Sequence, residues 1–187
     1  MLLVGHDWGA AVAWWTAIHH PDRIKKLAIL NVPHPAVMRE NLFNNWSQVK
    51  RSWYIFFFQL PWMPEWFMSH DDFATAIKSI SAKYELTSTD IERYKEAWGR
   101  PRAVKSMINW YRAAFRSLKK AKGKGNVTVP TLMLWGKLDT ALGSEMAQPS
   151  IDLCENGKLI FFEDATHWVQ HEKAEDVNNH LLEFFRE

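Results

Sequence analysis

The chain has little cysteine, little net charge and no long apolar run. Its 187 residues include one cysteine, Cys154, which excludes an internal disulfide and indicates a reducing compartment. The formal net charge is only +2, and the basic cluster Lys119–Lys124 reads as a short solvated linker, so no nucleic-acid partner is indicated. At 47% hydrophobic residues, the chain can still bury a sizeable core.

The most apolar segment, residues 53–64, is too short to span a bilayer and contains two prolines. We therefore expect no transmembrane span. The first residues also lack the basic region and cleavable apolar segment of a secretory signal. These absences favour a cytoplasmic protein, and they leave the oligomeric state open.

The most informative motif is Gly-His-Asp-Trp-Gly at residues 5–9, between the apolar residues 2–4 and a helical run from Ala10. This spacing is typical of a nucleophile on a tight turn between a strand and a helix. We expect both glycines to lack room for a Cβ atom, so that Asp7 is lifted into the open. A carboxylate attacking a carbonyl would give a mixed anhydride, so Asp7 predicts an alkyl electrophile, either an epoxide or a halide.

An ester on Asp7 must be cleaved by water, which requires a general base and an acid that orients the base. His167 follows the predicted strand 158–162, and Asp139 follows the predicted strand 129–135. Both loops belong to the carboxyl edge of a parallel sheet. The order nucleophile, acid, histidine is that of the α/β-hydrolases, so we predict Asp139 and His167 as the partners of Asp7.

Two other residues compete for these roles. Asp164 and His171 lie close to His167 in the sequence, but their positions are more typical of a surface loop and a helix start.

The helix that follows Asp7 has its N-terminus at the predicted nucleophile, which favours an ionised carboxylate. The N–H of Trp8 is the predicted oxyanion donor.

The leaving group distinguishes the two electrophiles. Opening an epoxide gives an alkoxide that needs an acid, and tyrosine can donate a proton to it. Two of the four tyrosines, Tyr54 and Tyr111, lie in aromatic segments of the central region. A halide needs no proton and suits the indole N–H groups of the 11 tryptophans. From the pattern alone, packing explains each tyrosine as well as a catalytic role does.

Strand and helix patterns divide the chain into three segments. Residues 1–34 and 127–187 alternate strands with helices, whereas 35–126 has helical patterns and no convincing strand. We predict two parts of one α/β core with a helical lid inserted between them. A nucleophile only seven residues into the chain leaves no room for upstream strands, so we expect the C-terminal part of a longer protein.

Several segments together resemble the α/β-hydrolase-fold epoxide hydrolases, in particular the epoxide hydrolase 4-like branch and its bacterial relatives. They are residues 5–9, 53–62, 109–112, 134–136 with Asp139, and 166–168. The resemblance covers essentially the whole chain. It implies the C-terminal portion of an α/β-hydrolase fold, with a parallel sheet flanked by helices and a helical lid.

The resemblance also implies an activity, the hydrolysis of an apolar epoxide to a vicinal diol through an aspartyl ester, without metal or organic cofactor. Asp7 would be the nucleophile, His167 the base, Asp139 the orienting acid, and Tyr54 and Tyr111 the proton donors. The family's upstream His-Gly-x-Pro loop, which supplies a second oxyanion donor, is absent. The elbow motif is also found in haloalkane dehalogenases, so a dehalogenase or a catalytically silent truncated hydrolase remain the alternatives.

Overall fold

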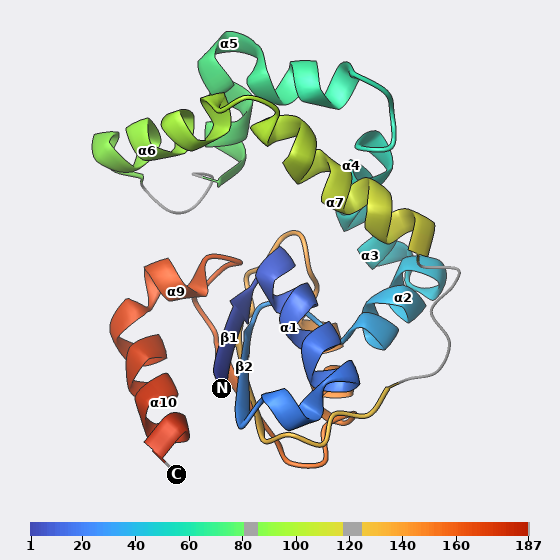
Figure 1. Ribbon diagram of the computed structural model, residues 1–187, viewed down its shortest axis with the longest axis vertical. Helices are drawn as coiled ribbons and strands as arrows, with labels where there is room; N and C mark the ends of the chain where they lie inside the picture. The colour runs from blue at the N-terminus through green and yellow to red at the C-terminus, as the bar shows by residue number, and fades with distance from the viewer. Residues whose placement is uncertain (81–85, 118–124, 187) are drawn as a thin grey trace. The chain divides into compact units, whose positions relative to one another are not determined.

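The computed structural model describes residues 1–80, 86–117 and 125–186 (Figure 1). The chain forms two compact units. The first contains Met1–Ser52 and Lys122–Glu187, and the second contains Trp53–Ala121. The basic cluster Lys119–Lys124, predicted as a solvated linker, lies outside the described residues.

The first unit is built on a four-stranded parallel sheet whose strands lie side by side in chain order. The strands are β1 (Leu2–His6), β2 (Lys26–Leu30), β3 (Thr131–Gly136) and β4 (Gly157–Phe162). The four strands predicted from the sequence are confirmed. All carboxyl ends meet at one edge, because every neighbouring pair is parallel.

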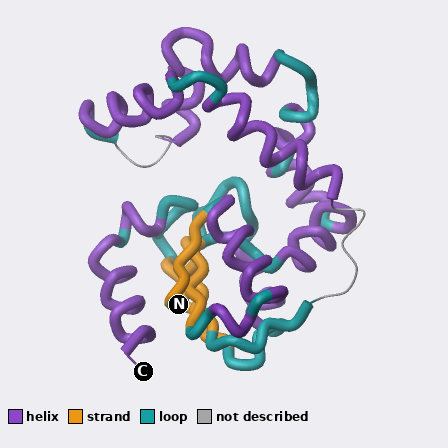
Figure 2. Tube along the Cα trace, viewed as in Figure 1, coloured by secondary structure: helices purple, strands orange, loops and turns teal. Residues whose placement is uncertain are grey.

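Helices cover both faces of this sheet, with α1 on one side and α10 on the other (Figures 1 and 2). The α-helices of this unit are α1 (Trp8–His19), α2 (Pro35–Asn44), α3 (Trp46–Arg51), α8 (Ala147–Ile151), α9 (Val169–Glu172) and α10 (Ala174–Arg186). Short 3₁₀ turns are formed by Pro21–Arg23 and Ser144–Met146.

Alternating side chains of the central strands enter two separate apolar cores. Leu27 and Ile29 pack in one core with Trp14 of α1. Ala28 and Leu30 pack in the other core, which includes apolar residues of α10. Burial on both faces explains why these strands read as nearly continuous apolar runs in the sequence.

The described residues of the second unit form helices joined by turns, with no strand among them. The unit contains α4 (Trp53–Phe57), α5 (Met63–Ile80), α6 (Ser88–Gly99) and α7 (Ala103–Ser117). A capping box begins α6, because Thr87 and Asp90 exchange hydrogen bonds there. The helix α5 changes direction at residues 70–73. No helix in the described parts of the chain is long and apolar enough to cross a bilayer.

The boundary between the units differs from the predicted one. The lid was expected to begin at residue 35, but α2 and α3 group with the sheet, and the second unit begins at Trp53. A buried glutamine, Gln48, explains part of this grouping. Its amide donates to the carbonyl of Ala141 over 2.8 Å and accepts from the N–H of Gly143 over 3.0 Å. Side-chain pairing of this kind leaves no trace in a helical sequence pattern.

Buried His34 caps α2 through its imidazole. Its Nε2 donates to the carbonyl of Gly125 over 3.0 Å, and its Nδ1 accepts from the N–H of Ala36 over 3.2 Å. The contact with Ala36 requires a neutral ring, because a protonated Nδ1 cannot accept. Burial lowers the pKa of His34 from 6.5 to about 4, against the opposing effect of the Gly125 hydrogen bond.

We expect the His34 contribution to stability to be complete above pH 6.5 and to be lost as the pH falls toward 4, because the unfolded chain protonates first. Between pH 7.5 and 5.0 this amounts to about 2 kcal/mol. His34→Asn keeps a capping side chain but does not titrate in this range. Urea unfolding followed by circular dichroism should show a smaller pH dependence in the variant. An equal dependence in both proteins would contradict the prediction.

Candidate active site

The turn that carries Asp7 lies between the end of β1 and the start of α1. Asp7 has φ 50° and ψ −130°, a backbone conformation that side-chain-bearing residues rarely adopt. A Cβ atom on Gly5 would lie 2.7 Å from the Cα of Ala10, which confirms the predicted close approach there. The same expectation is wrong for Gly9, because a Cβ atom there meets no described atom within 4 Å.

Three predicted residues meet at the carboxyl edge of the sheet. The Nε2 atom of His167 lies 3.2 Å from Oδ2 of Asp7, and its Nδ1 atom lies 2.7 Å from Oδ2 of Asp139. The side chain of Asp7 is 47% exposed, that of His167 is 15% exposed, and that of Asp139 is fully buried. The Asp7 carboxylate is therefore partly exposed, whereas the Asp139 carboxylate is closed to solvent.

Asp139 accepts four hydrogen bonds. Its Oδ1 accepts from the N–H groups of Ala141 and Leu142, over 2.8 and 2.9 Å. Its Oδ2 accepts from His167 and, over 3.0 Å, from the Nδ2 of Asn31. Burial acts to raise the pKa of Asp139, but the hydrogen bond and charge of His167 and these further donors hold it below the usual value.

Asn31 is a site residue that sequence reasoning missed. It follows β2 directly, is fully buried and has φ 50°. Its Oδ1 also accepts from the N–H of Gly136, over 2.9 Å, so Asn31 joins β2 to the start of the Asp139 loop. The sequence signal for Asn31 is its place at the same sheet edge as the loops that carry Asp139 and His167.

The loop before His167 is held by Glu172 of α9. Thr166 donates to this carboxylate through its N–H over 2.5 Å and through its hydroxyl over 2.6 Å. The competing candidates lie elsewhere on this surface. The exposed side chain of Asp164 pairs with Lys173 over 2.6 Å, and His171 is exposed on α9.

The two carboxylates favour an imidazolium at His167. Burial alone would lower the pKa of His167, but hydrogen bonds and charge from Asp139 and Asp7 raise it to about 9. Burial likewise acts to raise the pKa of Asp7, and its hydrogen bond with His167 and the nearby charge bring it below the usual value. Both shifts favour an imidazolium held between two carboxylates.

Trp8 binds the side chain of Asp7. Its N–H, the predicted oxyanion donor, donates to Oδ1 of Asp7 over 2.7 Å. The opposite oxygen, Oδ2, is the one that faces His167. Trp8 therefore fixes the orientation of the Asp7 carboxylate in this state.

The predicted tyrosines meet within the second unit. The rings of Tyr54 in α4 and Tyr111 in α7 lie 5.8 Å apart, nearly perpendicular to each other. Arg112, next to Tyr111, donates to the carbonyls of Phe58 and Leu60 over 2.9 and 2.6 Å. Its guanidinium also pairs with Glu65 through both terminal nitrogens, over 2.5 and 3.0 Å, which joins α7 to α5. Aromatic packing and the hydrogen bonds from Arg112 to the segment after α4 thus hold the two tyrosines together.

A family model described as the alpha/beta hydrolase fold matches residues 1–174. The chain belongs to the α/β-hydrolase fold family. Among curated proteins, it is 41% identical to the AB hydrolase superfamily protein YfhM of Bacillus subtilis and 35% identical to human epoxide hydrolase 4. These alignments cover 99% and 100% of this α/β-hydrolase but 65% and 53% of the relatives, so the chain spans between about half and two thirds of their length.

A solved epoxide hydrolase structure has the same fold as this α/β-hydrolase. The crystal structure of Bacillus megaterium epoxide hydrolase in complex with an inhibitor superposes with a TM-score of 0.89 at 28% identity. The match covers all of this chain and 69% of that one. The predicted fold class, a parallel sheet flanked by helices from part of an α/β-hydrolase, is therefore confirmed.

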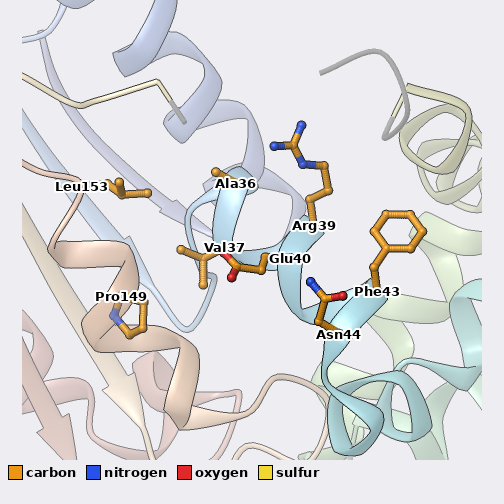
Figure 3. Close-up of a pocket in the computed structure, with 8 residues that line it drawn as sticks. All are labelled: Ala36, Val37, Arg39, Glu40, Phe43, Asn44, Pro149 and Leu153. Carbon is orange, nitrogen blue, oxygen red and sulfur yellow. The ribbon is translucent and has the colours of Figure 1, made fainter. Parts of the chain in front are cut away.

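The α/β-hydrolase also has a pocket of about 390 Å³ that is separate from the predicted site residues (Figure 3). It lies between α2, which contributes Arg39, Glu40 and Phe43 among others, and the chain around Pro149 and Leu153. None of the predicted site residues lines it. Nothing in its lining supplies a nucleophile and base together.

Proposed function

We propose that this α/β-hydrolase converts apolar epoxides to vicinal diols through a covalent ester on Asp7. The observation that carries the proposal is the hydrogen-bonded chain from Asp7 through His167 to buried Asp139. An aspartate in the nucleophile position selects an alkyl electrophile, and the tyrosine pair favours an epoxide over a halide. Relatives named epoxide hydrolases support the same reaction class.

In the first step, a carboxylate oxygen of Asp7 attacks an epoxide carbon and the carbon–oxygen bond of the ring breaks. The alkoxide takes a proton from the hydroxyl of Tyr54 or Tyr111, and the resulting tyrosinate regains a proton from solvent. The product of this step is a hydroxyalkyl ester. Trp8 supports the attack because its N–H fixes the orientation of the carboxylate.

In the second step, ester formation changes the behaviour of His167. The ester is neutral, so one of the two charges that raise the pKa of His167 disappears. The imidazolium can then release its proton to solvent and act as a base toward water. His167 takes a proton from water while the resulting hydroxide attacks the ester carbonyl carbon, and it returns that proton to the departing alkoxide as the diol leaves. The carboxylic acid left on Asp7 then gives its proton to His167, which restores the carboxylate and the imidazolium.

The surroundings of the tyrosines support an apolar substrate. Phe58 packs against Tyr111 with ring centroids 4.8 Å apart and against Tyr54 at 5.9 Å. An aromatic wall of this kind binds aryl and alkyl groups and offers few partners for charged ones.

A single turnover in ¹⁸O-labelled water, with protein in excess over an aryl epoxide, tests the proposal. We expect the first diol to carry unlabelled oxygen from Asp7 and the peptide containing Asp7 to gain one ¹⁸O, because water attacks the ester carbonyl. Mass spectrometry of diol and peptides measures both. Asp7→Ala is the control and should form no diol. Label found in the first diol would indicate direct attack by water and would overturn the ester mechanism.

A further inference from the structure

His6, the last residue of β1, contacts the loop that carries the base. Its Nε2 lies 2.8 Å from the main-chain oxygen of His167, and its Nδ1 lies 3.3 Å from the Nε2 of Gln170 in α9. The rings of His6 and His167 are 4.6 Å apart. A side chain next to the nucleophile is therefore bonded to the backbone of the predicted base.

The hydrogen-bond chemistry fixes the form of this contact. A carbonyl only accepts, so the Nε2 of His6 must donate to His167. A neutral imidazole has one N–H, which leaves Nδ1 as an acceptor for the amide N–H of Gln170. The Oε1 of Gln170 is buried and has no hydrogen-bond partner among the described residues. The Gln170 amide is therefore oriented so that its N–H donates to Nδ1 of His6, although this leaves its own oxygen without a partner among the described residues.

The contact controls a part of His167 that Asp139 does not reach. Asp139 orients the imidazole through Nδ1, whereas His6 binds the main chain of the same residue. On the other side, Thr166 is anchored to Glu172. Of these anchors, the His6 bond is the one that ties the base loop to the strand leading into Asp7.

We propose that His6 and Gln170 are positioning residues that hold the main chain of His167, so that its imidazole stays aligned for hydrolysis of the ester on Asp7. This inference rests on the proposed function. It assigns a role to two side chains that touch neither the substrate nor the reacting atoms.

The charges around His6 support a neutral donor. Burial and the charge of His167 lower the pKa of His6 to about 4, while the main-chain hydrogen bond and the charges of Asp7 and Asp139 oppose this shift. A protonated His6 would place a second cation beside the imidazolium of His167. It would also turn Nδ1 into a donor facing the N–H of Gln170. Both effects would weaken the hold on the base loop.

The second chemical step depends most on this hold. Attack by Asp7 needs its carboxylate, which Trp8 orients through the N–H at the start of α1. Water activation needs the imidazole within hydrogen-bond reach of a water beside the ester, and a displacement of about 1 Å can cost about 100-fold in rate. Loosening the His167 main chain should therefore slow ester hydrolysis more than ester formation.

Two substitutions at one position separate hydrogen bonding from packing. His6→Leu removes both ring nitrogens, whereas His6→Gln can place an amide N–H where Nε2 stood. Gln170→Leu removes the partner of Nδ1 and serves if His6→Leu does not fold. His180→Leu is the matched control, because the His180 ring packs on Phe162 and belongs to α10. Circular dichroism checks the fold of each variant.

Rapid-quench mass spectrometry of the full chain with an aryl epoxide measures ester formation and ester loss separately. For His6→Leu we expect ester hydrolysis to fall about tenfold or more, ester formation to change less than about threefold, and ester to accumulate. His6→Gln should recover to within about threefold of the native rate, and Gln170→Leu should fall between the two. His180→Leu should match the native protein.

The ¹⁵N NMR titration of His167 without substrate gives a second readout that does not depend on catalysis. We expect the pKa of His167 to change in His6→Leu and to stay near the native value in His6→Gln. A folded His6→Leu protein with native ester hydrolysis, or with both steps slowed equally, would overturn the positioning role. If the native protein forms no ester, the proposed function fails, and an unchanged His167 titration in His6→Leu would then reject the positioning role separately.

Discussion

Replacing His167 by glutamine should stop the reaction after ester formation. Exposed to an apolar epoxide, His167→Gln should gain one substrate mass on Asp7 and release almost no diol. The physical reason is that Asp7 attacks without a base, whereas water needs one to attack the ester. A general base contributes roughly 10² to 10⁴ in rate, so ester hydrolysis should fall by about 10³-fold. Intact-protein mass spectrometry followed by peptide mapping measures the adduct and its position.

Two variants control this experiment. A second substitution, Asp7→Ala in the His167→Gln background, should abolish the added mass. His180→Gln, which removes an imidazole in α10 that packs on Phe162, should turn over like the native protein. A folded His167→Gln protein that gains no mass from a panel of epoxides would argue against epoxide hydrolysis, in favour of a haloalkane dehalogenase or a catalytically silent relative.

Replacing both Tyr54 and Tyr111 by phenylalanine should prevent epoxide opening. Phenylalanine keeps the two rings that pack 5.8 Å apart but removes both hydroxyl groups, and with them the acid for the alkoxide. We expect ester formation to fall by about 10²-fold or more in the double variant and by about tenfold in each single variant. Stopped-flow mixing with an aryl epoxide, read out by quenched mass spectrometry, measures this step.

The same variants separate the two predicted electrophiles. Halide departure needs no proton, so a dehalogenase would keep its rate of halide release from a haloalkane after loss of the hydroxyls. Tyr94→Phe is the matched control, because Tyr94 lies in the same helical unit and stacks on Trp98. The assignment of these tyrosines would be contradicted if the double variant kept native epoxide turnover. It would also be contradicted if the double variant released halide from a haloalkane as fast as the native protein does.

The sheet and three site residues followed from the sequence for one physical reason. Parallel strands bring their carboxyl ends to a single edge, so polar residues just after separate strands must come together even when they are distant in sequence. Asp7, Asp139 and His167 each have that position. Only strand patterns and loop positions were needed to predict their meeting, and those patterns are strong in a sheet buried on both faces.

Asn31 and His6 could not be predicted in the same way. Both act on backbone groups or on a second carboxylate, and which main-chain atom faces a side chain depends on loop conformations that no residue pattern encodes. His6 even lies inside the most informative motif, but the chemistry of that motif requires only Asp7 and the turn around it. The domain boundary was predicted at the wrong residue for a similar reason. Glutamine on a helix usually indicates a solvent-exposed face, whereas the amide of Gln48 is buried against the sheet unit.

The order of the strands has a consequence for how this protein can change during evolution. Strands β2 and β3 pair directly in register, although the whole of Trp53–Ala121 lies between them in the sequence. The helical unit is thus an insertion between two paired strands of the sheet. Mutations and length changes in this insertion need not disturb the pairing of those strands. On the proposed function, the residues of the sheet unit that form and hydrolyse the ester and the apolar residues that surround the two tyrosines are free to diversify at different rates.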